Sequence, residues 1–183
     1  MTPEWMVIIP LKSFTVAKGR LRTHLGSEAA TALAQTLAAG VVSAARPRHT
    51  LVVTDDDAVA DWANALGVEI FRPSAPGLNV AVQEAYESLK GREIQAVITH
   101  GDLAQPHGLG SFVADDGITL YSDHHGVGTN VLVLPSGLDF TFRYGPHSLQ
   151  LHREEASRLH LPCTIVKDSP WAYDIDEVSD LDR

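Results

Sequence analysis

The sequence predicts an α/β fold with a mostly parallel central sheet and helices on both of its faces. Short apolar runs alternate with longer amphipathic runs through four successive units of the first half of the chain. One of these runs, IQAVIT at residues 94–99, has the apolar character expected of a central parallel strand. The 183 residues contain no internal repeat and no long linker, so we expect a single domain over residues 1–183.

In the first half, each expected strand is a short apolar run and each expected helix is longer and amphipathic. The strands are expected at residues 5–10, 50–54, 68–71 and 94–99. The helices are expected at residues 27–45, 56–67 and 80–91. Ser27 is a suitable N-cap for the first of these helices, and acidic residues suit the start of the second, which ends at Gly67.

The second half is less regular. Its expected elements are strands at residues 117–122 and 129–135, a helix at residues 147–160 and a last strand at residues 163–167. In a sheet of this kind, ligands bind beyond the carboxyl ends of the strands. The segments that directly follow the strands are therefore the first place to look for functional residues.

Charge and cysteine content exclude several classes of protein. A net charge of -9 argues against general binding to nucleic acid or to a membrane surface, because both partners are polyanions. No apolar run approaches the roughly 18 residues that span a bilayer, and the N-terminus lacks the basic region of a signal peptide. The one cysteine, Cys163, allows no internal disulfide, which indicates a reducing compartment and a cytoplasmic location.

A basic segment follows the first expected strand. PLKSFTVAKGRLRTHL (residues 10–25) carries Lys12, Lys18, Arg20 and Arg22 and no acidic residue. Lysine binds phosphate as a point charge and arginine adds bidentate contacts, so an extended basic loop at this place suits a triphosphate. The alternative is a solvated loop that happens to be basic. The segment contains neither GxxxxGK[ST] nor GxGxxG.

Aspartates stand at two further places. Asp102 lies in HGDL beyond the run at residues 94–99, where a carboxylate is well placed for Mg²⁺, and His100 two residues before it could be a further ligand. Asp174 and Asp176 are one residue apart, so in an extended segment their side chains point to the same face. The alternatives are that Asp102 caps a turn, that His100 is only a hydrogen-bonding group, and that the C-terminal acids are solvated.

Two further segments could bind a small anion. HHGVGTNVLVLP is punctuated by glycines and offers Thr129 at the start of a strand. RYGPHS places Gly145 and Ser148 at an expected helix start, where free N–H groups and the helix dipole favour anions. A simple turn and an ordinary serine cap are the alternatives. Cys163 is interpreted as a buried strand residue rather than a nucleophile.

The ordered set of motifs PLKSFTVAKGRL, VVTDDDAVA, GLNVAV, HGDL, HGVGTNVLVL, RYGPHS and DIDEVSDL resembles one family. That family is the guanylyltransferases of coenzyme F-420 biosynthesis, which includes 2-phospho-L-lactate guanylyltransferase and phosphoenolpyruvate-using relatives. The resemblance covers nearly the whole chain. It implies a Rossmann-like (GT-A-like) nucleotidyltransferase fold of three layers that uses GTP and Mg²⁺ and joins GMP to a small phosphorylated carboxylate.

The resemblance also implies roles for individual residues, by matching motifs. The implied catalytic residues are Lys12, Lys18 and Asp102. The implied nucleotide-binding residues are Lys12, Lys18, Arg20 and Asn79. The implied metal ligands are Asp102, Asp174 and Asp176, and the implied acceptor-binding residues are Thr129, Gly145 and Ser148. Arg22 matches no family position and is expected to be solvated.

The chain departs from the family pattern at Ala104, at His124 and at Glu177 and Val178, where the family usually has proline, arginine and Thr-Pro. None of these departures removes an implied ligand, but the lost arginine leaves the acceptor open. The alternatives are 3-phosphoglycerate as acceptor, another nucleotidyltransferase on the same scaffold, and a phospho-receiver signalling domain built on Asp55 to Asp57. The oligomeric state is not predicted.

Overall fold

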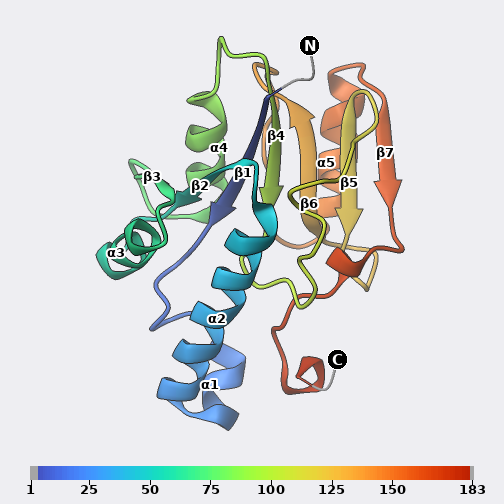
Figure 1. Ribbon diagram of the computed structural model, residues 1–183. Coiled ribbons are helices and arrows are strands. Elements are labelled where there is room, and N and C mark those ends of the chain that lie inside the picture. Colours follow the sequence, from blue (N-terminus) through green and yellow to red (C-terminus); the bar gives the residue numbers. More distant parts are fainter. Residues whose placement is uncertain (1–3, 182–183) are drawn as a thin grey trace.

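The structure is a computed structural model that describes residues 4–181, and Figure 1 shows its elements around one sheet. The strands are β1 (Glu4–Pro10), β2 (His49–Val53), β3 (Glu69–Phe71), β4 (Ile94–Thr99), β5 (Ile118–Ser122), β6 (Thr129–Pro135) and β7 (Cys163–Val166). The α-helices are α1 (Gly19–Leu25), α2 (Ser27–Ala45), α3 (Asp57–Ala65), α4 (Leu78–Glu87) and α5 (Ser148–Arg158). Two 3-10 turns, η1 (Pro170–Ala172) and η2 (Val178–Asp180), follow β7.

The sheet has the strand order β3-β2-β1-β4-β6-β5-β7. All neighbouring pairs are parallel except the two that involve β6, which runs antiparallel to β4 and to β5. The predicted α/β class with a mostly parallel sheet is confirmed. Residues 94–99 form β4, which was expected to have parallel neighbours on both sides. Its neighbour β1 is parallel, but its other neighbour β6 is antiparallel. The direction of β6 is reversed because a short connection joins it to β5, which runs parallel to β4.

Helices cover both faces of the sheet, which confirms the three layers. Side chains alternate between the faces along each strand, so that Ile8 of β1 packs with α4 and α5, while Ile9 packs with α2 and α3. Both residues are fully buried. Burial of both faces explains why the central strands are continuous apolar runs in the sequence. No helix within residues 4–181 has the length and apolarity needed to cross a bilayer.

The sequence predicted that the basic segment after β1 is an extended loop. The structure shows this for its first half only. Helix α1 occupies its second half, and Leu21 anchors this helix in the core. Gly26, with a φ of 82°, separates α1 from α2 and is the N-cap residue of α2, so Ser27 is not the cap. A short helix with one buried leucine leaves little apolar periodicity, and this explains why the sequence did not reveal it.

Arg22 is also not solvated, contrary to expectation. Its guanidinium donates hydrogen bonds to the carbonyl oxygens of Ala17 (2.8 Å), Ser27 (3.0 Å) and Phe14, and to Thr31 Oγ1 (3.0 Å). A planar guanidinium with five N–H donors can join several carbonyl oxygens at once. Arg22 therefore holds the loop before α1 against α2.

One edge of the sheet collects the polar loops. The parallel strands β1, β2, β4, β5 and β7 end at this edge, and β6 begins there because it runs in the opposite direction (Figure 1). The segments that carry the candidate residues, at positions 11–18, 100–104, 123–129, 145–148 and 167–176, adjoin this edge. The topology thus assembles the site from loops that are far apart in the sequence.

Candidate active site

A cleft of about 780 Å³ opens at the carboxyl ends of β1, β2 and β4. Its lining comes from the loops that follow these strands, from the segment before α4 and from the C-terminal segment. The charged and titratable residues in the lining are Lys12, Lys18, Asp55, Asp56, His100, Asp102 and Asp176. The sequence predicted functional residues in the segments that follow the strands. The basic loop after β1 and the loops after β2 and β4 do line one cleft.

Lys18 is the buried cation of the cleft. Its side chain is 4% exposed, and its Nζ donates hydrogen bonds to Asp102 Oδ2 and, over 3.1 Å, to Asp176 Oδ1. Lys18 precedes α1 with a φ of 60°, a left-handed conformation that few residues other than glycine adopt. Burial works against the charge, but the attraction of Asp102 and Asp176 outweighs it and raises the pKa of Lys18.

Asp174 lies beside the cleft residue Asp102, although it is not itself a lining residue, and long-range backbone pairing places it there. The residue pair Leu103 and Asp174 forms an antiparallel β-bridge, and the Ile175 N–H donates to the Asp102 carbonyl over 3.1 Å. This pairing places the Asp174 carboxylate beside that of Asp102. Burial, and then the charge of Asp102, raise the pKa of Asp174 above its ordinary value. Asn130, the second residue of β6, donates to Asp174 Oδ1 over 3.3 Å.

The arrangement suits a divalent cation. His100, Asp102 and Asp174 each offer one ligand atom, and these atoms lie within 4.8 Å of one another. Within residues 4–181 this is the one group of histidine, cysteine and acidic side chains with such spacing. Asp176 adds a third carboxylate nearby, and Lys18 is the only cation paired with them among the described residues. A metal ion would offset the remaining negative charge.

The structure places the other nucleotide-binding candidates differently from one another. Lys12 is exposed and lines the cleft. Arg20 lies outside the cleft lining and forms an exposed ion pair with Glu177, over 2.6 Å. Asn79 lies in the first turn of α4, and its amide group clamps the Tyr144 backbone, donating to the carbonyl oxygen over 3.0 Å and accepting from the N–H over 2.6 Å.

The acceptor-binding candidates are brought together, but two of their side chains are buried. Thr129 and Ser148 are 1% and 3% exposed, and Ser148 Oγ accepts a hydrogen bond from the Thr129 N–H over 3.0 Å. Ser148 is the first residue of α5 and is not its cap, since His147 takes that position without a side-chain bond. Gly145 is exposed, with a φ of 132°.

Sequence reasoning missed His152, which completes this buried group. Its Nδ1 lies 3.1 Å from Thr129 Oγ1, and its Nε2 accepts a hydrogen bond from the Arg143 N–H over 3.0 Å. Because Nε2 accepts, the proton of the neutral ring is on Nδ1. Burial lowers the pKa of His152 to about 4. A signal was present in the sequence, since Ser148 and His152 are one turn apart on α5.

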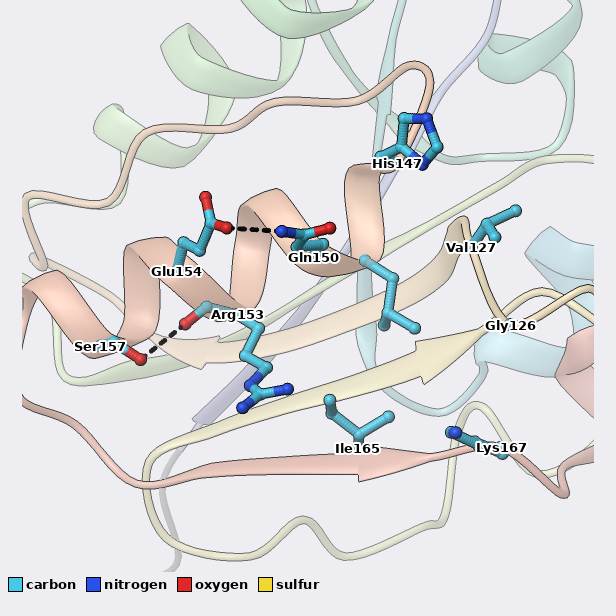
Figure 2. A pocket seen from close by; sticks show the side chains of 10 residues that line it. Gly126, Val127, His147, Gln150, Arg153, Glu154, Ser157, Ile165 and Lys167 are labelled. Carbon is cyan, nitrogen blue, oxygen red and sulfur yellow. Dashed lines mark hydrogen bonds between the residues drawn. The ribbon is translucent and has the colours of Figure 1, made fainter.

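A second hollow, of about 570 Å³, lies between α5 and the edge strand β7 (Figure 2). Figure 2 shows the Arg153 side chain pointing from α5 toward Ile165 of β7, with Lys167 at the end of that strand. The hollow shares no lining residue with the cleft, and neither Asp102 nor Asp174 lines it. The chemistry is therefore assigned to the cleft.

Two alternative interpretations lose support: a phospho-receiver domain built on Asp55 to Asp57, and a nucleophilic role for Cys163. Asp56 caps α3, because its Oδ1 accepts a hydrogen bond from the Val59 N–H over 2.9 Å, as the helix-start interpretation of residues 55–57 predicts. Burial raises the pKa of the Cys163 thiol, which lies half-buried in β7, so it lacks the lowered pKa of a nucleophilic cysteine.

The fold and the family to which the chain belongs define the class of protein, a nucleotidyltransferase. A nucleotidyl transferase from a Methanothermobacter species shares the fold with a TM-score of 0.66 at 14% identity, over 97% of this chain and 94% of that one. The family model "Guanylyl transferase CofC like" matches residues 5–183. The chain belongs to this family of guanylyltransferases, and the expected family is confirmed.

Two named relatives span nearly the whole chain. A phosphoenolpyruvate guanylyltransferase from Salinispora arenicola is 33% identical, over 99% of this chain and 87% of its own length. A 2-phospho-L-lactate guanylyltransferase from Methanocaldococcus fervens is 28% identical, over 96% of this chain and 82% of its own length.

Proposed function

We propose that this protein transfers GMP from GTP to the phosphate of a small phosphorylated carboxylate, with release of pyrophosphate, in coenzyme F-420 biosynthesis. Phosphoenolpyruvate is the first acceptor to test, because the relative at 33% identity is a phosphoenolpyruvate guanylyltransferase. 2-Phospho-L-lactate is the second. The observation that carries the proposal is the buried Lys18, held between Asp102 and Asp176 beside Asp174.

The nucleotide is assigned to the cleft of about 780 Å³. Lys12 and Lys18 would offset charge on the triphosphate, with Arg20 as a supporting charge at the margin and Asn79 acting through the Tyr144 backbone. We assign GTP binding and a divalent cation to this site, and the reaction to the cytoplasm.

Mg²⁺ would be held by Asp102 and Asp174, with Asp176 nearby. Bound there, it would supply positive charge that offsets the negative charge of both substrates. The chain itself contributes the buried ammonium of Lys18, whose raised pKa keeps it protonated at neutral pH. Asp102 and Asp176 orient that ammonium toward the cleft.

The nucleophile is an oxygen of the acceptor phosphate, which attacks the α-phosphorus of GTP and displaces pyrophosphate. The second pKa of a phosphate monoester is about 6, so the phosphate is mostly dianionic at neutral pH and needs no general base. The difficulty is electrostatic, since two anionic substrates must meet. Positioned cations therefore supply the catalysis.

The acceptor is assigned to the loops around Thr129, Gly145 and Ser148. Thr129 and Ser148 would act by holding the backbone of these loops, because their side chains are buried and Ser148 Oγ accepts a hydrogen bond from the Thr129 backbone N–H. Gly145 offers exposed backbone at a φ that side chains rarely adopt, so contact with the acceptor there would come from the main chain.

The test is a competition assay with GTP, Mg²⁺ and equal amounts of phosphoenolpyruvate, 2-phospho-L-lactate and 3-phosphoglycerate, with products identified by mass. We expect a guanylylated product of one acceptor and stoichiometric pyrophosphate. Parallel reactions with ATP and CTP serve as controls. Pyrophosphate release that prefers CTP or ATP, or none with GTP and any of the three acceptors, would overturn the proposal.

A further inference from the structure

His100 lies directly after β4 and lines the cleft. Its backbone N–H donates to the Asn130 carbonyl oxygen over 3.0 Å, which ties the residue to the start of β6. Its Nδ1 faces Asp102 Oδ1 across 4.0 Å. This separation is too long for a hydrogen bond, so the two groups face each other without direct contact.

The gap has the size that a metal ion would fill. Two ligands bound to one ion, each at about 2.1 Å, lie at most about 4.2 Å apart. The 4.0 Å between His100 Nδ1 and Asp102 Oδ1 falls within this limit. Asp174 supplies the third atom of a group whose members all lie within 4.8 Å of one another. A small side-chain movement would bring all three onto one ion.

Asp176 is engaged elsewhere. Its Oδ1 accepts a hydrogen bond from Lys18 Nζ over 3.1 Å, and its side chain is 57% exposed. It is not part of the group of ligand atoms formed by His100, Asp102 and Asp174. The third ligand indicated by the geometry is therefore the His100 nitrogen, where the family resemblance implied an Asp176 oxygen.

The orientation of the ring agrees with this role. His100 Nδ1 points to the carboxylates, while Nε2 is buried and has no hydrogen-bond partner among residues 4–181. A neutral ring that presents the Nδ1 lone pair to a metal carries its proton on Nε2. The Tyr144 ring lies near the same histidine, with 5.8 Å between the ring centroids and the two rings tilted to each other.

We propose that His100 is a metal ligand through Nδ1, together with Asp102 and Asp174, so that this site prefers a first-row transition ion, with Mn²⁺ as its representative, to Mg²⁺. The proposal rests on the proposed nucleotidyltransferase function for the place of the metal. Mg²⁺ takes oxygen ligands almost exclusively, whereas imidazole suits Fe²⁺, Ni²⁺, Cu²⁺ and Zn²⁺; Mn²⁺, the weakest binder of the first-row series, serves as its paramagnetic probe. One nitrogen ligand beside two carboxylates therefore shifts the preference of the site away from Mg²⁺ and toward a first-row transition ion.

The test is pulsed electron paramagnetic resonance of the Mn²⁺-loaded protein, with Mn²⁺ alone and with a GTP analogue that cannot be cleaved between the α- and β-phosphates. A nitrogen-14 coupling of a directly bound imidazole is expected in the wild type. It is expected to disappear in His100→Asn and in His100→Gln, and to remain in His107→Asn, which changes an exposed histidine outside the cleft lining.

Calorimetric titration adds the affinities. We expect His100→Asn to weaken Mn²⁺ binding by about tenfold or more and Mg²⁺ binding by clearly less. Thermal melts of each variant within a few degrees of the wild type establish that it folds.

A wild type without Mn²⁺ binding or nitrogen coupling, or a coupling that persists in both His100 variants, would refute the proposal. So would Asp176→Asn if it weakened Mn²⁺ binding as much as His100→Asn. These measurements need no acceptor and no turnover. A protein that bound Mn²⁺ through His100 but guanylylated no acceptor would contradict the proposed function and leave the metal ligand established.

Discussion

Two groups of polar side chains at the same edge of the sheet differ in charge: one contains charged side chains and the other only neutral ones. The charged cluster, formed by Lys18, His100, Asp102 and Asp174, brings a buried ammonium group together with two carboxyl groups and an imidazole at the cleft. The neutral network, formed by Thr129, Ser148 and His152, pairs uncharged groups beneath the neighbouring loops. Asn130 links the two groups, because it follows Thr129 on β6 and donates a hydrogen bond to Asp174.

The difference separates reactive chemistry from scaffold. In the neutral network, burial lowers the pKa of His152 and the ring stays uncharged with both nitrogens bonded. In the charged cluster, burial and Asp102 raise the pKa of Asp174, so its ionised form is disfavoured in the folded protein. Groups held against their own preference are typical of functional sites. The variants below test this contrast, in order of decreasing expected effect.

Lys18→Met should have the largest effect, because it removes the only cation paired with the cleft carboxylates within residues 4–181. We expect guanylyl transfer to fall by about 10²–10³-fold. Stability should also fall, by about 2 kcal/mol, because Asp102 loses its buried partner; this value is reduced for the partial exposure of Asp102.

The matched control for this substitution is Lys90→Met, which removes an exposed lysine outside the cleft lining. Pyrophosphate release and urea denaturation measure the two effects. Near-normal turnover by the Lys18 variant would show that the buried cation has no catalytic role.

Asp174→Asn should lower turnover by a similar 10²-fold or more but leave the fold as stable or more stable. The amide keeps an oxygen that can accept from Asn130, and it removes a carboxylate whose ionisation burial and Asp102 both oppose. Steady-state kinetics and thermal melting are the measurements, with the exposed Asp168→Asn as the control. A melting temperature several degrees below the wild type would contradict the assignment of Asp174 to the charged cluster.

His152 should make stability depend on pH. Burial lowers the pKa of His152 from its ordinary value of 6.5 to about 4. Between these values the unfolded chain binds a proton that the folded chain does not, so this contribution is complete above pH 6.5 and is lost as the pH falls toward 4. At pH 5 the loss is about 2 kcal/mol.

The measurement is urea denaturation at pH 7.5 and pH 5.0. His152→Gln has no ionisable ring, so its stability should fall by about 2 kcal/mol less between the two pH values than that of the wild type. The exposed His160→Gln is the control and should follow the wild type. Equal pH dependence of all three proteins would mean that His152 is protonated in the folded state.

Much of the fold was predictable because it depends on local patterns. The strands at residues 94–99 and 129–135 have the bounds of the apolar runs that predicted them. The class of site was predictable as well, since a carboxyl-edge rule pointed to the loops with Lys18 and Asp102. What the sequence could not reveal depends on long-range contacts. The bridge between Leu103 and Asp174, which selects His100 as the neighbour of the two carboxylates, is such a contact.

Side-chain roles were harder to predict than backbone elements. Arg22 and Arg20 are both basic residues of one segment, yet Arg22 closes the loop through four hydrogen bonds and Arg20 forms an exposed ion pair. Composition cannot distinguish them, because the difference arises from their places in α1, where residues two positions apart lie on different faces of the helix. The family resemblance separated Arg20 from Arg22 but attached no role to the residue that organises the loop.

Arg20→Gln should have the smallest effect. The Arg20 and Glu177 side chains are 74% and 56% exposed, so their ion pair contributes less than about 1 kcal/mol to stability. As a supporting charge outside the cleft lining, Arg20 should change the KM for GTP by no more than about threefold at physiological salt, since exposed charges are screened. Glu177→Gln should have an equally small effect on stability. A tenfold rise in KM for the Arg20 variant alone would instead mean that Arg20 leaves Glu177 and contacts the triphosphate directly when GTP binds.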